Sequence, residues 1–269
     1  MIKDITIGQF FPGKSVIHRL DPRIKLLLTV LYIVMLFTAK GFTGLGVGVV
    51  FMLIAFLLSG IPIKMMLKSV KPILPIIIFT GILNLFFITG GDILVEWKFI
   101  KITTGGVTTM IFMAVRILLL IFGTSLLTYT TSPITLTDAI ERVLSPLKVV
   151  KFPAHEIAMM MTIALRFIPT LIEETDKIIS AQKARGADME TGNILKRAKA
   201  LIPILIPLFV SAFRRAEELA LAMECRCYHG GEGRTRLKQL KTAPRDYVAV
   251  AFALIFLAAI IVLNIYSPI

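Results

Sequence analysis

The sequence predicts an all-α protein: a polytopic membrane helical bundle with long amphipathic coupling helices on the cytoplasmic side. Three observations support this fold class. Hydrophobic residues make up 56% of the 269 residues, and the mean hydropathy is +0.83. Several uncharged runs approach the length needed to cross about 30 Å of hydrocarbon. Between residues 129 and 245 the chain is too apolar for a linker and too charged to span a membrane, yet it carries amphipathic helical patterns.

Uncharged runs between flanking charges predict five spans: 26–39, 41–63, 72–91, 117–137 and 247–269. The first run is short, so we expect the flanking Lys25 and Lys40 to extend toward the interfaces. Arg116 lies in or at the edge of the fourth span, where a centred arginine costs about 2.5–3.5 kcal/mol. We therefore expect it to face the bundle or lie near an interface. The glycines of 41–48 indicate close helix packing or a bend.

Basic residues beside the spans predict the orientation. Only Lys40 lies in the first connecting loop, whereas five basic residues precede the first span: Lys3, Lys14, Arg19, Arg23 and Lys25. The amino terminus is therefore expected in the cytoplasm. Residues 129–245, with 18 Lys and Arg against 12 Asp and Glu, are expected on the same side. The last span then leaves the carboxyl terminus outside.

Four parts follow from this topology: a cytoplasmic amino-terminal segment at 1–23, four spans within 24–131, a cytoplasmic coupling-helix region at 132–245 and a last span at 246–269. The amino terminus lacks a signal-peptide pattern, so we expect the first span to remain in the mature protein. The net charge of +13 is explained by the cytoplasmic basic residues. No nucleic-acid motif accompanies it, and no nucleic-acid partner is expected.

The periodicity predicts three helices in the cytoplasmic region, at about 133–144, 155–185 and 192–228, with Pro169 as a kink in the second. In the later half of the second helix, Leu171 and Ile178 lie on one face. Glu173 and Glu174 lie on the opposite, solvated face. We expect these helices to lie along the membrane surface or to cross one another beneath the bundle.

The second and third helices each run into an isolated arginine, in Ala184-Arg185-Gly186 and in Cys225-Arg226-Cys227. Seven residues are nearly two helical turns, so a residue seven positions earlier shares a face. Two series have this spacing with a constant offset between them: Leu171, Ile178 and Arg185, then Ala212, Leu219 and Arg226. Each arginine thus continues the apolar stripe of its helix.

No acidic residue stands one turn before either arginine, because those positions are Ala181 and Gln182, and Ala222 and Met223. An acceptor outside the chain is therefore implied. The alternative for a single arginine is a solvated cation near a helix C-terminus, where the helix dipole favours it. The matched pair favours a functional contact.

Cys225, Cys227 and His229 resemble half of a metal site that Glu232 or His155 would have to complete. Alternate helical residues point to different faces, so we expect neither a metal nor another cofactor. A structural disulfide is not expected between cytoplasmic cysteines.

The chain contains no phosphate-binding loop, which argues against ATP hydrolysis by the chain itself. One alternative class remains: a polytopic membrane enzyme acting on a lipid-like substrate through His155, His229 and acidic residues. The spans offer few polar side chains beyond Asn84 and Arg116, which argues against such an enzyme.

The opening Ile7-Gly8-Gln9-Phe10, then Pro12-Gly13 and the run from His18 to Leu26, resembles the transmembrane T component of energy-coupling factor transporters of the shared-module type. The order of spans, the long helical region with two X-Arg-X triplets and the last span extend the resemblance over essentially the whole chain. It implies a scaffold in the bacterial cell membrane. That scaffold would couple two ABC-type ATPases to a separate membrane-embedded S component that binds a vitamin or metal ion.

In that family the two triplets end coupling helices that dock on the ATPases. Carried over to this sequence, the docking residues would be Ala184, Arg185, Gly186, Cys225, Arg226 and Cys227. Cys227 stands where the family commonly has glycine, which puts the helix-ending geometry in question more than the docking. The two unlike triplets suggest two different ATPases.

Overall fold

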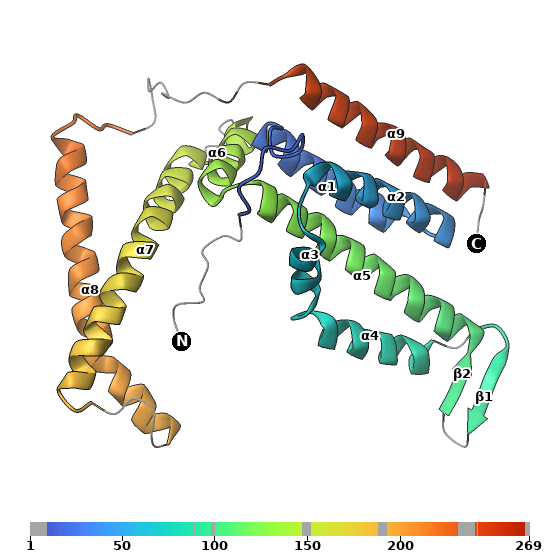
Figure 1. Ribbon diagram of the computed structural model, residues 1–269, viewed down its shortest axis with the longest axis horizontal. Coiled ribbons are helices and arrows are strands. Elements are labelled where there is room, and N and C mark those ends of the chain that lie inside the picture. The colour runs from blue at the N-terminus through green and yellow to red at the C-terminus, as the bar shows by residue number, and fades with distance from the viewer. Residues whose placement is uncertain are drawn as a thin grey trace. The chain divides into compact units, whose positions relative to one another are not determined.

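The computed structural model describes residues 10–88, 90–97, 100–146, 152–187, 193–230, 240 and 242–266 (Figure 1). The described chain is almost entirely helical, which confirms the predicted all-α class. Contacts divide it into two compact units. The first, here called the membrane unit, holds residues 8–139 and 239–269; the second, here called the crossed-helix unit, lies in residues 140–238. Ile7, Gly8 and Gln9 of the opening motif lie outside the described residues.

Six helices form the membrane unit: α1 (Pro22–Thr38), α2 (Phe42–Ser59), α3 (Ile63–Val70), α4 (Leu74–Phe87), α5 (Thr104–Thr130) and α9 (Pro244–Tyr266). The long α5 contacts α1, α2, α3 and α4, while α9 packs on α1 and α2. The buried core between them includes Tyr32, Leu36, Leu45, Met52 and Leu119. Many large apolar side chains on the outer faces are exposed, as expected where a helix meets lipid.

Glycines allow α2 and α5 to approach α1 closely. A Cβ added at Gly48 would lie 2.7 Å from Cδ2 of Leu36, and one added at Gly123 would lie 2.5 Å from the ring of Tyr32. Both distances are shorter than ordinary van der Waals contacts, so an alanine at either site would force the side chain of Leu36 or Tyr32 to shift. The glycine-rich start of α2 therefore serves close packing, as the sequence indicated.

Four described helices are long and apolar enough to cross a membrane, namely α2, α5, α7 (Ala154–Ala184) and α9. The pair α3 and α4, bent by 57° at its break, adds a fifth candidate. The expected spans 41–63, 72–91 and 247–269 correspond to α2, α4 and α9. The helix α1 has 17 residues, which is short for a span. The helix α7, placed in the cytoplasm by the sequence argument, is the least apolar of the four.

The expected fourth span, 117–137, is wrong at both ends. The helix α5 begins at Thr104 and ends at Thr130, and α6 (Pro133–Leu144) follows as a separate helix. Arg116 consequently lies near the middle of α5, where the search for uncharged runs had set a boundary. The helix tolerates this charge because Nη2 of Arg116 donates to the carbonyl of Ala39 at 2.6 Å, and the guanidinium lies 4.5 Å from the ring centroid of Phe112. The expectation that Arg116 faces the bundle is confirmed.

Two further features differ from the sequence analysis. An antiparallel hairpin, β1 (Ile93–Trp97) and β2 (Ile100–Thr103), precedes α5 and was not predicted. Lys25 does not extend to an interface: its side chain is buried, and Nζ donates to the carbonyls of His18 and Thr130 at 3.1 and 2.9 Å. Lys40 is exposed, as expected.

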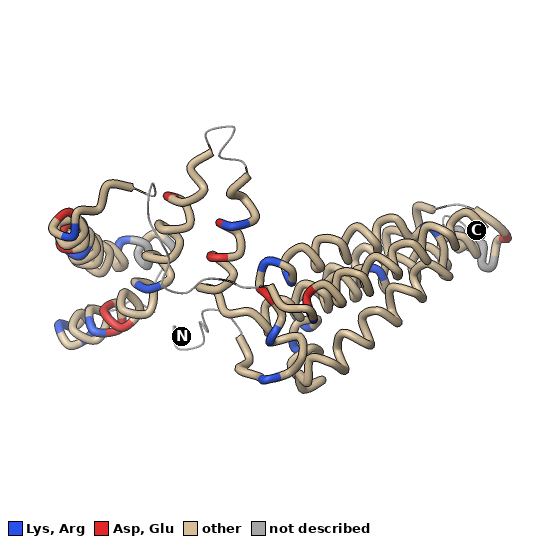
Figure 2. Tube along the Cα trace, turned by 90° about the horizontal axis from the view of Figure 1, so that it is seen from above, with Lys and Arg blue, Asp and Glu red and all other residues tan. Residues whose placement is uncertain are grey.

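Lys and Arg residues concentrate at one end of the membrane unit (Figure 2). Six described basic residues beside or within its helices are exposed, namely Lys14 and Arg19 before α1, Lys64, Lys68 and Lys71 at α3, and Arg245 at the start of α9. This asymmetry is the distribution on which the orientation was predicted.

The crossed-helix unit is built from the end of α6 and two helices of 31 residues each, α7 and α8 (Ile194–Glu224). The three helices expected at 133–144, 155–185 and 192–228 are therefore confirmed. Pro169 lies inside α7, and Pro203 and Pro207 lie inside α8.

Candidate docking site

The helices α7 and α8 end in the same hydrogen-bonded cap. At the end of α7 the N–H of Gly186 donates to the carbonyl of Lys183 at 3.0 Å, and that of Ala187 donates to Gln182 at 3.0 Å. At the end of α8, the N–H of Cys227 donates to Glu224 at 2.8 Å, and that of Tyr228 donates to Met223 at 3.1 Å. This pair of bonds defines a Schellman motif, in which Arg185 and Arg226 both occupy the C-cap position.

The residue after the C-cap must adopt a left-handed backbone in this motif. Gly186 does so with φ 82°, as glycine does at little steric cost. Cys227 adopts φ 55°, and no other non-glycine residue in the described part of the chain has a positive φ. The cysteine therefore takes the same left-handed backbone region as Gly186. The sequence analysis had put the geometry of this helix end in question. The cap of α8 nevertheless has the same hydrogen bonds and the same left-handed residue as the cap of α7.

All six residues of the two triplets are exposed. Within the described ranges, neither Arg185 nor Arg226 makes a side-chain hydrogen bond or an ion pair. The stripe residues Leu171, Ile178 and Leu219 are half-buried, in contrast to the arginines that extend the same stripe. Each helix thus presents a cation at its tip that no group in the described chain neutralises.

The two helices pack against each other and cross (Figure 1). Nη2 of Arg215 donates to Oε2 of Glu174 at 2.8 Å, and Nε of Arg215 lies 3.5 Å from Oγ of Ser211. The Ser211 hydroxyl and then Arg215 hold the pKa of Glu174 below its ordinary value. The expectation that Glu174 lies on a solvated face is therefore wrong, because α8 covers it. Glu173, its neighbour, is exposed.

The spacing of this pair is visible in the sequence. Glu174 and Arg215 are 41 residues apart, the same offset that relates Arg185 to Arg226. Equivalent positions of the two helices thus carry opposite charges. Near the end of α7, Nε2 of Gln182 donates to the carbonyl of Pro203 at 3.5 Å. Because this bond joins late α7 to early α8, the helices run in opposite directions and the triplets lie at opposite ends of the pair (Figure 1).

Residues of the opening motif form a polar junction at the start of α1. Asp21 is the N-cap: Oδ1 accepts the N–H of Arg23 at 2.9 Å, and the Arg23 side chain pairs with the same carboxylate at 2.6 Å. Burial alone would raise the pKa of Asp21, but the hydrogen bonds from Arg23 outweigh it and lower the pKa. Nη2 of Arg23 also donates to the carbonyl of Leu240, just before α9.

Asp246, which the sequence analysis did not single out, completes this junction from α9. Its Oδ1 accepts the backbone N–H of Asp21 at 2.9 Å, and its Oδ2 accepts the N–H of Ala243 at 2.7 Å. Since Lys25 binds the carbonyl of Thr130 at the end of α5, the motif joins three helices. Its described residues have structural roles inside the membrane unit.

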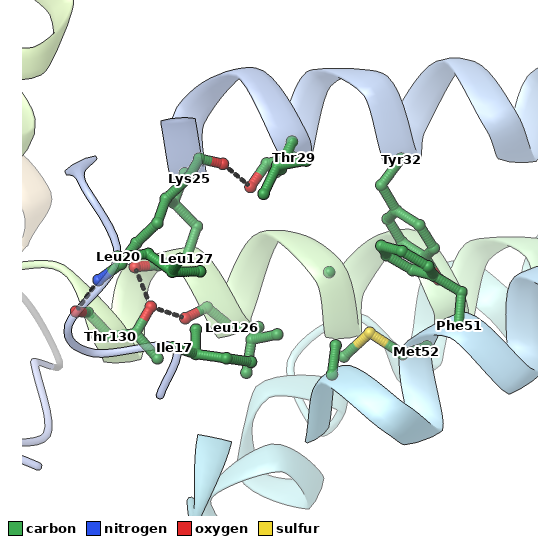
Figure 3. A pocket seen from close by; sticks show the side chains of 13 residues that line it. Ile17, Leu20, Lys25, Thr29, Tyr32, Phe51, Met52, Leu126, Leu127 and Thr130 are labelled. Atoms are coloured by element: carbon green, nitrogen blue, oxygen red, sulfur yellow. Dashed lines mark hydrogen bonds between the residues drawn. The ribbon is translucent and has the colours of Figure 1, made fainter. Parts of the chain in front are cut away.

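A small cavity of about 90 Å³ lies next to this junction, between α1, α2 and α5 (Figure 3). Its walls are almost wholly apolar, with Tyr32, Phe51 and Met52 at one end and Lys25 and Thr130 at the other (Figure 3). Lys25 is the one titratable group with a charge at neutral pH among the lining residues, and its Nζ bonds backbone carbonyls. This cavity is unlike a catalytic site, which brings several polar groups together.

The possible metal ligands do not converge in the described residues, among which no group of three or more His, Cys, Asp or Glu side chains is placed to hold an ion. Nδ1 of His155 instead lies 3.0 Å from Oε1 of Glu141, joining the start of α7 to α6. Cys225, Cys227 and His229 are all exposed. Glu232, the remaining candidate ligand, lies outside the described residues.

Fold and site together define a class: a multi-pass helical membrane protein that carries a crossed pair of arginine-tipped helices. The chain belongs to the CbiQ family, described as cobalt transport protein, whose family model matches residues 13–237.

Relatives cover nearly the full length. The chain is 54% identical over 264 residues to the energy-coupling factor transporter transmembrane protein EcfT of Ruminiclostridium cellulolyticum, covering 98% of each chain. It is 54% identical over 267 residues to EcfT of Clostridium kluyveri, covering 99% of each. Against EcfT of Bacillus subtilis the identity is 46% over 261 residues, covering 97% of this chain and 98% of that one. The resemblance to the T component is confirmed. The chain is a transport subunit and not an enzyme, so the alternative of a lipid-modifying enzyme is wrong.

Proposed function

We propose that this chain couples ATP hydrolysis by two cytoplasmic ABC-type ATPases to uptake of a vitamin or metal ion through a separate membrane-embedded S component. The ATPases dock on the tips of α7 and α8, through Ala184, Arg185 and Gly186 and through Cys225, Arg226 and Cys227. One observation carries this proposal: both helices end in the same cap with an exposed arginine at the same position. Two equivalent tips suit two related partners.

The orientation is part of the proposal. The amino terminus and residues 132–245 lie in the cytoplasm of a bacterial cell, because basic residues flank the membrane unit at the end where α1 begins. The second half of α7 supports a cytoplasmic place for that helix. It carries four charged residues in a row of five, Glu173, Glu174, Asp176 and Lys177 around Thr175, which hydrocarbon would strongly disfavour.

Arginine suits this docking role for a physical reason. Its planar guanidinium keeps its charge in any environment and offers several donors to a carboxylate or to backbone carbonyls. Both arginines are exposed at the ends of their helices, so a groove on a partner can receive them without unwinding the helix. Because no described group of the chain competes for either arginine, an acceptor on the ATPase gains the full contact.

Co-purification of the ATPases with the tagged chain tests this proposal. In the double variant Arg185→Glu, Arg226→Glu, attraction becomes repulsion in a partly desolvated contact. The cost is several times the 0.2 to 1 kcal/mol or so of an exposed pair. We expect the ATPases to be lost while the chain still enters the membrane and binds detergent as a folded protein.

The matched control is Arg214→Glu, which reverses the charge of an exposed arginine in the middle of α8. It should retain both ATPases. Retention of both ATPases and normal transport by the double variant would contradict the docking role.

A further inference from the structure

Between the described residues of α7 and α8, one side-chain hydrogen bond joins Arg215 to Glu174 at 2.8 Å, and a longer one joins Gln182 to the carbonyl of Pro203 at 3.5 Å. Apolar side chains along the two stripes give an attraction that does not define a register, since burial of apolar area is non-directional. The contact between Arg215 and Glu174 does define one. At 2.8 Å, and with Ser211 beside both side chains, it is broken by any slide of one helix along the other.

This contact lies at equal distances from the two docking arginines. Arg185 follows Glu174 by eleven residues, and Arg226 follows Arg215 by eleven residues. Each arm is therefore about 16 Å long at 1.5 Å per residue. Neither arm contains a proline, since Pro169 precedes Glu174 and both Pro203 and Pro207 precede Arg215. Both arms are thus unbroken helix, so a shift at the crossing is carried directly to the tips.

We propose that Glu174 and Arg215, together with Ser211, are positioning residues that fix the crossing point and thereby set the separation of Arg185 and Arg226 for two ATPases that move together. A slide by one helical turn would displace one tip by about 5.4 Å relative to the other. Such a change leaves each arginine able to dock but mismatches the pair. The contact is therefore needed for transmission of movement more than for binding.

The pair is only partly buried, with side chains 39% and 23% exposed for Arg215 and Glu174. Its role is consequently one of register and not of overall stability. This inference rests on the proposed docking function, and the two can fail separately, because the docking test changes the arginines at the tips and the test of the crossing leaves them intact.

The experiment compares transport per ATP hydrolysed by the full complex in liposomes. We expect Glu174→Arg, which opposes two cations at the crossing, to reduce that ratio about threefold or more. The charge swap Glu174→Arg, Arg215→Glu should restore it to within about a factor of two, as a double-mutant cycle requires for a direct contact. The matched control Glu173→Arg makes the same charge change at the adjacent exposed position and should leave the ratio unchanged.

A distance measurement reads the register itself. With Cys225→Ala and Cys227→Gly removing both native thiols, spin labels on Lys183→Cys and Glu224→Cys report the separation of the two tips in the full chain. We expect one narrow distribution, a broadened or shifted one with Glu174→Arg, and recovery in the swap.

Each outcome decides the matter. If Glu174→Arg lowers transport per ATP hydrolysed and the swap restores it, the positioning role is supported. An unchanged ratio and distance distribution in Glu174→Arg, or a loss that the swap does not restore, would overturn it. If reversing Arg185 and Arg226 has no effect while Glu174→Arg does, the docking proposal fails and the crossing acts in some other way.

Discussion

Cys227 occupies a backbone conformation that L-residues seldom adopt, and it does so because the cap of α8 requires it. A residue with a Cβ in the left-handed region costs roughly 1–2 kcal/mol. The two N–H groups of Cys227 and Tyr228 satisfy carbonyls that would otherwise be left unpaired. The need to end the helix at Arg226 therefore outweighs the steric preference of the cysteine.

This conformation leads to a prediction about position 227. Cys227→Gly should retain ATPase binding or tighten it, since glycine adopts φ 55° at little cost. Cys227→Val should weaken binding several-fold, because a β-branched residue at positive φ disrupts the cap and redirects Arg226. Titration of the chain with purified ATPase measures both effects.

Ala216→Val provides the control, because it places the same β-branched residue at an exposed helical position of α8 outside the triplet. Its affinity should match the original chain. Equal affinity of the glycine and valine variants would show that the cap geometry does not position Arg226.

Among the elements, α9 is fixed at its start by Asp246, which is 2% exposed and accepts two backbone N–H bonds, one from Asp21 and one from Ala243. The carboxylate thus caps its own helix and joins it to the start of α1. Arg23 adds a second link through Leu240. Together these bonds tie the last helix to the first.

We predict that Asp246→Ala lowers the thermal unfolding midpoint of the purified chain by several degrees. Loss of a cap costs about 0.5–2 kcal/mol, and the orphaned buried N–H of Asp21 costs about 1–3 kcal/mol. Asp246→Asn, which keeps one acceptor oxygen, should have an intermediate effect. Arg245→Gln, at the exposed neighbouring position, should leave the midpoint unchanged. A midpoint for Asp246→Ala equal to that of the original chain would contradict the capping role.

How far the sequence could predict the elements depended on the kind of signal. Periodicity located α6, α7 and α8 to within a few residues, and glycine spacing correctly indicated close packing at α2. The search for uncharged runs gave the wrong bounds for α5, because it treats Arg116 as a boundary. The group that accommodates this arginine, the carbonyl of Ala39, is 77 residues away in the sequence. Asp246 escaped notice for the same reason: its bond to Asp21 spans 225 residues, and no local pattern reports such a contact.

The candidate site followed a similar division. The triplets were found from their spacing alone, because helical periodicity places each arginine on its stripe. The identical caps were not predictable, since Cys227 breaks the expected glycine and only the backbone shows that the geometry is kept. The ion pair of Glu174 and Arg215 depends on how two helices cross, which the face assignment of one helix cannot give.

For the molecule as a whole, the side of the membrane that holds the crossed-helix unit decides whether its arginines can meet cytoplasmic ATPases. Length and apolar composition alone allow α7 to be a span. If α7 crossed the membrane, α8 and its triplet would lie outside. The charges of α7 and the basic end of the membrane unit argue that the crossed-helix unit lies in the cytoplasm. The two arrangements differ in the side of the membrane on which the tip of α8 lies.

The native thiols distinguish these arrangements, because the chain has two cysteines, Cys225 and Cys227, and both are exposed at that tip. We expect a membrane-impermeant maleimide to leave the original chain unlabelled in intact cells and to label it after permeabilisation.

In the background Cys225→Ala, Cys227→Gly, the variant Asp92→Cys places a thiol in the exposed segment before β1, on the opposite side by the charge rule. It should be labelled in intact cells, which confirms that the reagent reaches the outer surface. Because bound ATPases would shield the tips, the labelling is done with the chain expressed alone. Labelling of Cys225 or Cys227 in intact cells would place the tip of α8 outside and remove the basis for docking, whether or not Asp92→Cys is labelled.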